Sequence, residues 1–270
     1  MVVAYGTPLP PLSAGYGLTE PRKRGKLVLH HPRGAWRCGP PRVTIRGVFT
    51  SIPSATACRD RVRFLVDGFN LYHSVKAAAK ATGAGPYKWI DLAGLCRSYL
   101  PQLGATAALD RVHYFSALAS HLGPTNPDVV RRHQVFLRAL KGSGVIVELA
   151  HFKRRDRTCG ACGARIKIYE EKETDVAIAV TLVELATGGA CETIVLVSGD
   201  TDLAPALRAA RRLAPAVRLC AVFPFGRHNR ELQQLADLSF KVPEGKYAQH
   251  QFPDPLILSN GKTVRKPATW

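Results

Sequence analysis

The chain has no apolar run that approaches the ~18 residues of a membrane-spanning helix. Residues 1–20 also lack the apolar core behind a basic start that marks a secretory signal. The seven cysteines are odd in number and irregularly spaced, which argues against a secreted disulfide scaffold. We therefore expect a soluble, cytoplasmic protein with no membrane partner.

Several motifs of well-known chemistry are also missing. Without a G-x-G-x-x-G or Walker loop, the sequence gives no support to nucleotide-cofactor chemistry, and without a G-x-S-x-G elbow it gives none to a serine hydrolase. Acidic residues are few, with 20 Asp and Glu against 38 Lys and Arg. The net charge of +18 favours a polyanionic partner, because Lys and Arg displace counterions from phosphates. A basic tail on an ordinary enzyme would give the same balance.

Composition divides the chain into three parts. Residues 1–60 are rich in Pro and Gly, contain a basic cluster at 22–26 and show little periodicity, so we expect a disordered basic N-terminal arm. From Arg61 to 242, short apolar runs alternate with helical patterns. This alternation predicts an α/β, Rossmann-like domain with a mostly parallel central sheet and helices on both faces. Residues 243–270 are interpreted as a C-terminal tail.

The pattern predicts the individual elements of this domain as well. We expect strands at 62–66, 111–115, 145–149, 193–197 and 217–222, with an edge strand at 238–242. We expect helices at 71–81, 91–100, 127–140, 173–186, 203–213 and 229–237, and a basic loop at 153–165.

Four aspartates stand at positions that this fold brings to one edge. Asp67 and Asp200 each follow a buried strand, Asp202 begins the next helix, and Asp175 lies near the start of another. Clustered carboxylates repel one another, and a divalent cation would offset that repulsion. Oxygen-only ligands favour Mg²⁺ or Mn²⁺. The alternative is that Asp175 and Asp202 only cap helices, where a carboxylate suits the helix dipole.

Three segments carry a family resemblance: FLVDGFNLY at 64–72, YEEKETDVAIA at 169–179 and IVLVSGDTDL at 194–203. Together they resemble the NYN-domain family, the LabA-like branch of the PIN-like nuclease superfamily, over residues 61–242. The resemblance implies a PIN-like fold, Mg²⁺ or Mn²⁺, and RNA as the substrate. It puts Asp67, Asp175, Asp200 and Asp202 on the acidic metal-site positions. Asn70 falls on the Asn of the first segment, where it would orient Asp67 or bind a metal water.

Basic residues near these segments are candidate RNA contacts. The set comprises Lys172, Arg154, Arg155, Arg157, Arg227 and Arg230. Lys172 precedes Asp175 by three residues and would contact a phosphate, unless it is only a solvated charge. Arg227 and Arg230 flank a turn that opens a helix, a setting that suits phosphates but is also found in ordinary basic loops. The three remaining arginines form the densest basic patch of the domain.

A CxxC pair and a few aromatic residues complete the candidates. Cys159 and Cys162 supply two ligands, whereas structural zinc needs four and no second CxxC exists, so a reduced pair without zinc is favoured. A second subunit of a homodimer would have to complete a zinc site. Tyr72, Tyr87, Trp89 and Tyr114 would stack on bases or belong to the core.

Three functions remain open at this point. The favoured one is a metal-dependent ribonuclease acting on single-stranded RNA. The second is a non-catalytic RNA-binding or regulatory protein, which would have little reason to retain four acids at a phosphate-binding surface. The third is a small-molecule hydroxylase of the pyridine type, an activity described for some relatives of this branch, although no redox-cofactor motif is present.

Overall fold

The computed structural model describes residues 59–83, 85, 87–158 and 160–270. Almost all of the expected basic arm, residues 1–58, lies outside the described residues. Order along the described chain begins with a strand at Asp60, one residue before the predicted domain boundary.

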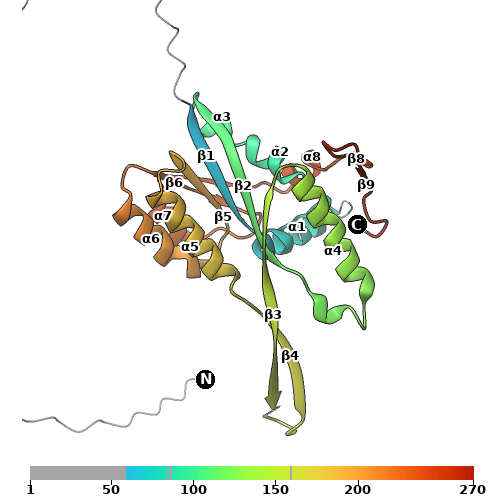
Figure 1. Ribbon diagram of the computed structural model, residues 1–270. Coiled ribbons are helices and arrows are strands. Elements are labelled where there is room, and N and C mark those ends of the chain that lie inside the picture. The colour runs from blue at the N-terminus through green and yellow to red at the C-terminus, as the bar shows by residue number, and fades with distance from the viewer. Residues whose placement is uncertain (1–58, 84, 86, 159) are drawn as a thin grey trace, which may run out of the picture. The chain divides into compact units, whose positions relative to one another are not determined.

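A seven-stranded sheet in the order β4-β3-β2-β1-β5-β6-β7 forms the centre of the domain (Figure 1). The strands are β1 (Asp60–Asp67), β2 (Ala107–Ala117), β3 (Ile146–Thr158), β4 (Arg165–Lys172), β5 (Thr193–Val197), β6 (Arg218–Phe223) and β7 (Leu238–Lys241). Every neighbouring pair is parallel except β3 and β4. The mostly parallel α/β fold predicted from the sequence is therefore confirmed, and the carboxyl ends of β1 and β5 meet at one edge.

Helices cover both faces of this sheet. One core contains α1 (Gly68–Thr82), α2 (Leu92–Arg97), α3 (Leu100–Leu103) and α4 (Pro127–Gly142), and the other contains α5 (Thr174–Thr187), α6 (Ala204–Leu213) and α7 (Arg230–Leu235). Side chains of β1 alternate between the two, with Phe64 and Val66 in the first core and Leu65 in the second. This two-sided burial explains why the strand reads as a continuous apolar run. Among the described helices, none combines the length and apolar character needed to cross a membrane.

Caps and prolines set the helix boundaries on the α1 side. Asp91 caps α2 as expected, because its Oδ1 accepts a hydrogen bond from the backbone N–H of Gly94 at 2.9 Å. The predicted single helix over 91–100 is wrong, since α2 ends at Arg97 and α3 begins at Leu100. Pro101 stands in the first turn of α3, where its missing N–H costs no hydrogen bond.

The predicted basic loop at 153–165 is instead a β-hairpin. Strand β3 runs on to Thr158 and pairs antiparallel with β4, with Lys153 opposite Glu170 and Arg157 opposite Ile166. The hairpin projects away from the helices in Figure 1. Its polar side chains lie on both faces of the ribbon, so the alternation of apolar and polar residues that signals a strand is absent from β3.

The predicted tail at 243–270 packs on the domain. It contains α8 (Lys246–Gln249), β8 (Leu256–Ile257) and β9 (Thr263–Val264). Tyr247 is fully buried, shares a 2.6 Å hydrogen bond with Ser74 Oγ, and accepts another from the backbone N–H of Phe225. Trp270 packs against Phe136. These aromatic anchors are scattered among polar residues with no period, so the sequence pattern gave no sign of them.

Candidate metal centre

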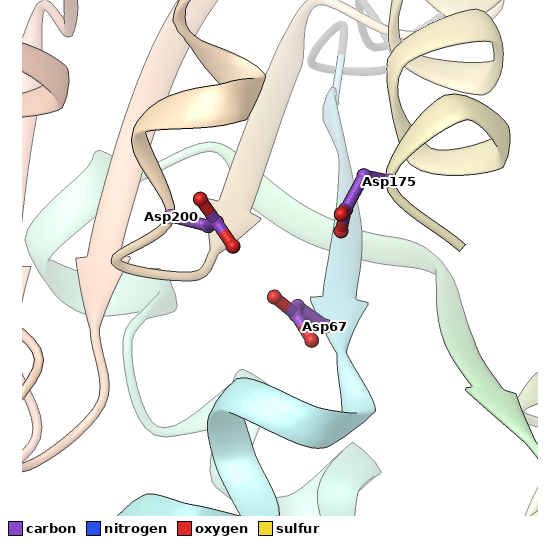
Figure 2. Close-up of side chains that lie close together, drawn as sticks. All are labelled: Asp67, Asp175 and Asp200. Carbon is purple, nitrogen blue, oxygen red and sulfur yellow. The ribbon is translucent and has the colours of Figure 1, made fainter. Parts of the chain in front are cut away.

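Asp67, Asp175 and Asp200 come together at the carboxyl edge of the sheet (Figure 2). One oxygen from each lies within 4.8 Å of the others. Asp67 is the last residue of β1, Asp200 follows the neighbouring strand β5, and Asp175 stands in the first turn of α5. The structure thus brings together three of the four aspartates that the sequence analysis named.

Both oxygens of Asp67 are held in place. Its side chain is only 3% exposed and caps α1, with Oδ1 accepting from the backbone N–H of Asn70 at 2.9 Å. The hydroxyl of Ser198 donates to Oδ2 at 2.8 Å, and the same Oγ accepts from the backbone N–H of Asp200 at 3.1 Å. Ser198 therefore links two of the three carboxylate residues.

Asn70 joins α1 to the turn after β5. Its Oδ1 accepts from the backbone N–H of Gly199 at 3.2 Å, while the Gly199 carbonyl accepts from Asn229 Nδ2 at 3.1 Å. A Cβ at Gly199 would lie 1.9 Å from the carbonyl oxygen of Arg227, so only glycine fits there. Asn70 therefore positions Asp67 through its backbone and the Asp200 turn through its side chain.

Among the described residues, no basic side chain forms an ion pair with the three carboxylates. Burial, followed by the charges of Asp67 and Asp200, raises the pKa of Asp175 to about 6. Burial also raises the pKa of Asp67, against the opposing effect of its hydrogen bonds. Within the described part of the chain, none of the three forms an ion pair. A set of oxygen donors in this state fits a divalent cation such as Mg²⁺ or Mn²⁺.

Two further acids lie around this centre. Asp202, the fourth predicted ligand, is exposed and outside the group, and its backbone N–H donates to Asp200 Oδ1 at 3.1 Å. Glu171 was not predicted from the sequence. It accepts hydrogen bonds from the backbone N–H and the hydroxyl of Thr174, and its charge adds to the raised pKa of Asp175. Its position three residues before the helix start was the available signal.

The profile of the NYN domain matches residues 61–242, and these residues contain the whole acidic cluster. The chain belongs to the NYN-domain family. Members of this family are generally nucleases of the PIN-like kind.

Two individual proteins resemble this NYN chain. The 6-hydroxy-3-succinoylpyridine 3-monooxygenase of Pseudomonas putida is 25% identical over 244 residues, which cover 78% of this chain and 75% of the relative. A protein of unknown function from Vibrio parahaemolyticus is 18% identical, with a TM-score of 0.46 over 68% of this chain and 94% of that one.

The basic candidates of the NYN domain lie in two exposed places. Lys172 and Arg155 both pair with Glu170 on the hairpin, at 3.0 and 3.5 Å, and Arg154 pairs with Asp156. Arg157 forms no ion pair with any described residue.

Arg227 and Arg230 form the second place. They lie on the loop after β6 and at the start of α7. The close approach of Gly199 to the Arg227 carbonyl puts this loop beside the turn that carries Asp200.

The CxxC pair is described only in part. Cys159 lies outside the described residues, and Cys162 is exposed and free. Among the described residues, Cys162 belongs to no group of three or more possible metal ligands.

Proposed function

We propose that this NYN protein is a metal-dependent ribonuclease of the LabA-like branch that hydrolyses phosphodiester bonds of single-stranded RNA. The observation that carries the proposal is the convergence of Asp67, Asp175 and Asp200 at the carboxyl edge of the sheet without a cationic partner among the described residues. Mg²⁺ or Mn²⁺ is the cofactor that these oxygen donors favour.

Each residue of the centre has a distinct part in this proposal. Asp67, Asp175 and Asp200 would hold the ion, which supplies Lewis-acid charge for a phosphodiester and lowers the pKa of water. Ser198 and Asn70 keep Asp67 and the Asp200 turn fixed, so no reorganisation is needed when substrate arrives. Asp202, which is exposed and outside the cluster, is free to accept a proton from the attacking water.

The RNA strand would be bound by the basic residues on either side of the carboxylates. The hairpin supplies Arg154, Arg155, Arg157 and Lys172, and the loop after β6 supplies Arg227 and Arg230. All six are exposed, and the ion pairs that some of them form are easily exchanged for phosphates.

Cleavage of an end-labelled single-stranded RNA by the full chain tests this proposal. We expect cleavage with Mn²⁺ or Mg²⁺, none with excess chelator, and recovery when the metal is added back. Duplex RNA of the same sequence should be cut more slowly. Cleavage that persists in chelator would contradict the assigned metal centre, and RNA binding without any turnover would favour a non-catalytic regulator.

A second candidate function is hydroxylation of a pyridine compound. It is favoured by the Pseudomonas putida relative, whose name describes a monooxygenase acting on a succinoylpyridine. Such a reaction needs a reductant and oxygen, so NADH- or flavin-dependent consumption of a hydroxypyridine is the distinguishing measurement. Turnover of the pyridine together with no RNA cleavage would establish this candidate in place of the ribonuclease.

A further inference from the structure

An apolar cavity of ≈ 270 Å³ opens beside the metal centre, on the α1 and α4 side of the sheet. Its wall is largely aromatic, formed by Phe69, Tyr72, Tyr114, Phe152 and Trp270. These residues come from α1, β2, β3 and the last residue of the chain, so segments distant in the sequence build one site. Two of the four aromatic residues singled out in the sequence, Tyr72 and Tyr114, line it, whereas Trp89 is buried in the core.

The cavity lies at the carboxyl end of β1, the strand whose last residue is Asp67. Gly68, the residue after Asp67, is part of its wall, as is Ser116 at the end of β2. A Cβ at Gly68 would lie 2.5 Å from the Phe115 carbonyl oxygen and 2.7 Å from the Tyr114 ring. The absence of that side chain lets the Tyr114 ring lie against the backbone next to Asp67. A ligand in the cavity would therefore contact the residue that directly follows Asp67.

Two half-buried cations also line this apolar space. Lys88 and Arg132 belong to its wall, and neither forms an ion pair with any residue in the described ranges. Burial, followed by the charges of Lys76 and Arg132, lowers the pKa of Lys88. His133 lines the cavity too, and burial lowers its pKa, which favours the neutral ring. Paired cations over an aromatic wall suit a ring that carries an anionic group.

We propose that this cavity receives a nucleobase of the RNA strand whose phosphodiester lies at Asp67, Asp175 and Asp200, while Lys88 and Arg132 contact a neighbouring phosphate. The inference rests on the ribonuclease function proposed above. The aromatic wall provides stacking, which every base can use, and few polar groups that could read a base edge. The site therefore positions the strand and accepts several bases.

Because Gly68, the residue after Asp67, lines the cavity, a nucleotide is favoured over a free aromatic acid as its ligand. A small aromatic acid would use the wall and the cations but would have no group to extend past Gly68 toward Asp67. A nucleotide within a strand has a phosphate on each side of its base, one for the metal centre and one for Lys88 and Arg132.

Calorimetric titration of the full chain in chelator, with UMP and AMP as probes, tests the cavity without any need for turnover. Ribose 5-phosphate is the matched probe that lacks a base, and we expect it to bind at least about tenfold more weakly. Ala119→Trp places a large ring in the cavity wall and should weaken UMP binding about tenfold or more. Ala216→Trp, at an exposed turn before β6, is the control and should leave binding unchanged.

A second variant keeps the test valid if Ala119→Trp does not fold. The double change Lys88→Gln, Arg132→Gln keeps the shape of the cavity and should weaken UMP and ribose 5-phosphate alike. Equal affinity for UMP and ribose 5-phosphate, full UMP binding in Ala119→Trp, or tighter binding of nicotinate than of UMP would each overturn the proposal. Nucleotide binding without RNA cleavage would support the cavity and reject the ribonuclease, whereas cleavage without nucleotide binding would reject the cavity alone.

Discussion

The carboxylate centre and the β3–β4 hairpin are opposite in nearly every physical respect. The centre is acidic and lies at the ends of adjacent parallel strands, with Asp67 only 3% exposed and hydrogen-bonded through both oxygens. The hairpin is basic and polar on both faces, and the side chain of Arg155 is 71% exposed. Chemistry on a phosphodiester requires fixed groups, whereas attraction of a polyanion requires only that positive charge be near.

The energetics of the two regions differ for the same reason. Exposed ion pairs such as Arg155 with Glu170 contribute only about 0–1 kcal/mol, because water already solvates both partners. A phosphate can therefore replace Glu170 at little cost. The carboxylates of the centre, of which Asp67 is buried and Asp175 and Asp200 are half-buried, have no such freedom, so loss of one should have a far larger effect than loss of one hairpin cation.

The largest expected effect is that of Asp200→Asn. This change keeps the shape of the side chain but removes one of three negative charges from the centre. We expect metal binding to weaken and Mn²⁺-dependent RNA cleavage to fall by a factor on the order of 10² or more, with Asp67→Asn behaving alike. Single-turnover cleavage and Mn²⁺ titration of each variant measure both quantities.

Asp128→Asn is the matched control for this change. Asp128 is exposed in the first turn of α4, and its one ion pair among the described residues is with Arg131. Asp237 is unsuitable as a control, because its carboxylate accepts from the backbone N–H of Leu219 and pairs with Arg211. Full activity of Asp200→Asn, or an equal loss of activity in Asp128→Asn, would mean that the carboxylate centre is no more sensitive to loss of charge than the exposed surface.

The next effect concerns the hairpin. Changing Arg154, Arg155 and Arg157 to Ala should weaken RNA binding and lower the log–log salt slope by about two units, if each contacts one phosphate. The turnover rate at saturating RNA should change little, since none of the three reaches the carboxylate group. Binding isotherms at several salt concentrations provide the slope.

Three arginines elsewhere give a control with the same loss of charge. Arg97, Arg111 and Arg212 are exposed and lie at the end of α2, early in β2 and near the end of α6. Their replacement by Ala should leave the salt slope nearly unchanged. An equal reduction in both triple variants would mean that net charge, and not the hairpin, determines affinity.

A smaller effect is expected at Ser198, which acts through Asp67. Ser198→Ala removes the buried hydrogen bond to Asp67 Oδ2 and leaves that oxygen without this donor. We expect Mn²⁺ affinity to fall several-fold, while the KM for RNA stays the same, because the hairpin is untouched. Ser198→Thr keeps the hydroxyl and should restore affinity, whereas a loss of folding alone would lower melting temperature without this rescue.

The comparison also shows what the sequence could reveal. Strand β5 was predicted at its observed bounds, since Thr193 and four buried apolar residues followed by Ser-Gly-Asp leave little choice. Asp67 and Asp200 were placed together because parallel strands share one carboxyl edge. Asp175 was placed with them from its position near the start of a helix, with capping as the alternative, and the resemblance to NYN domains supported its assignment to the metal site.

The remaining features depend on contacts between distant residues. The hairpin was missed because its strands are joined by backbone pairing and by exposed cross-strand ion pairs such as Arg155 with Glu170, which have no apolar period. Asp202 was expected in the cluster from its spacing and from the NYN resemblance, yet the turn at Thr201–Leu203 leaves it exposed. The C-terminal segment depends on single anchors, of which Tyr247 and Trp270 have no sequence signature.

The smallest expected effect is on the pH dependence of the melting temperature, compared between the metal-free and the metal-bound centre. The pKa of Asp175 is about 6 in the folded chain, against 3.8 for an ordinary aspartate. The protonated form therefore favours folding, and this contribution is complete below pH ~4 and is lost as pH rises through about 6. In chelator, Asp175→Asn should lack this loss and melt about 2–4 °C above wild type at pH 7, if solvent screening leaves about 1 kcal/mol of the destabilisation that burial and the neighbouring carboxylates cause.

Mn²⁺ should reverse the order of the two melting temperatures, so that wild type melts above Asp175→Asn at pH 7. Binding of Mn²⁺ requires the ionised carboxylates of the folded chain, so it stabilises wild type above pH 6 more than the variant. Melting curves from pH 4.5 to 7.5, in chelator and in Mn²⁺, measure both effects. The curves of wild type and variant should converge near pH 4.5 in chelator and cross when Mn²⁺ is added. If the melting temperatures of wild type and Asp175→Asn ran parallel with pH in chelator, ionisation of Asp175 would not destabilise the folded chain. The carboxylates of the centre would then behave like the exposed charges of the hairpin.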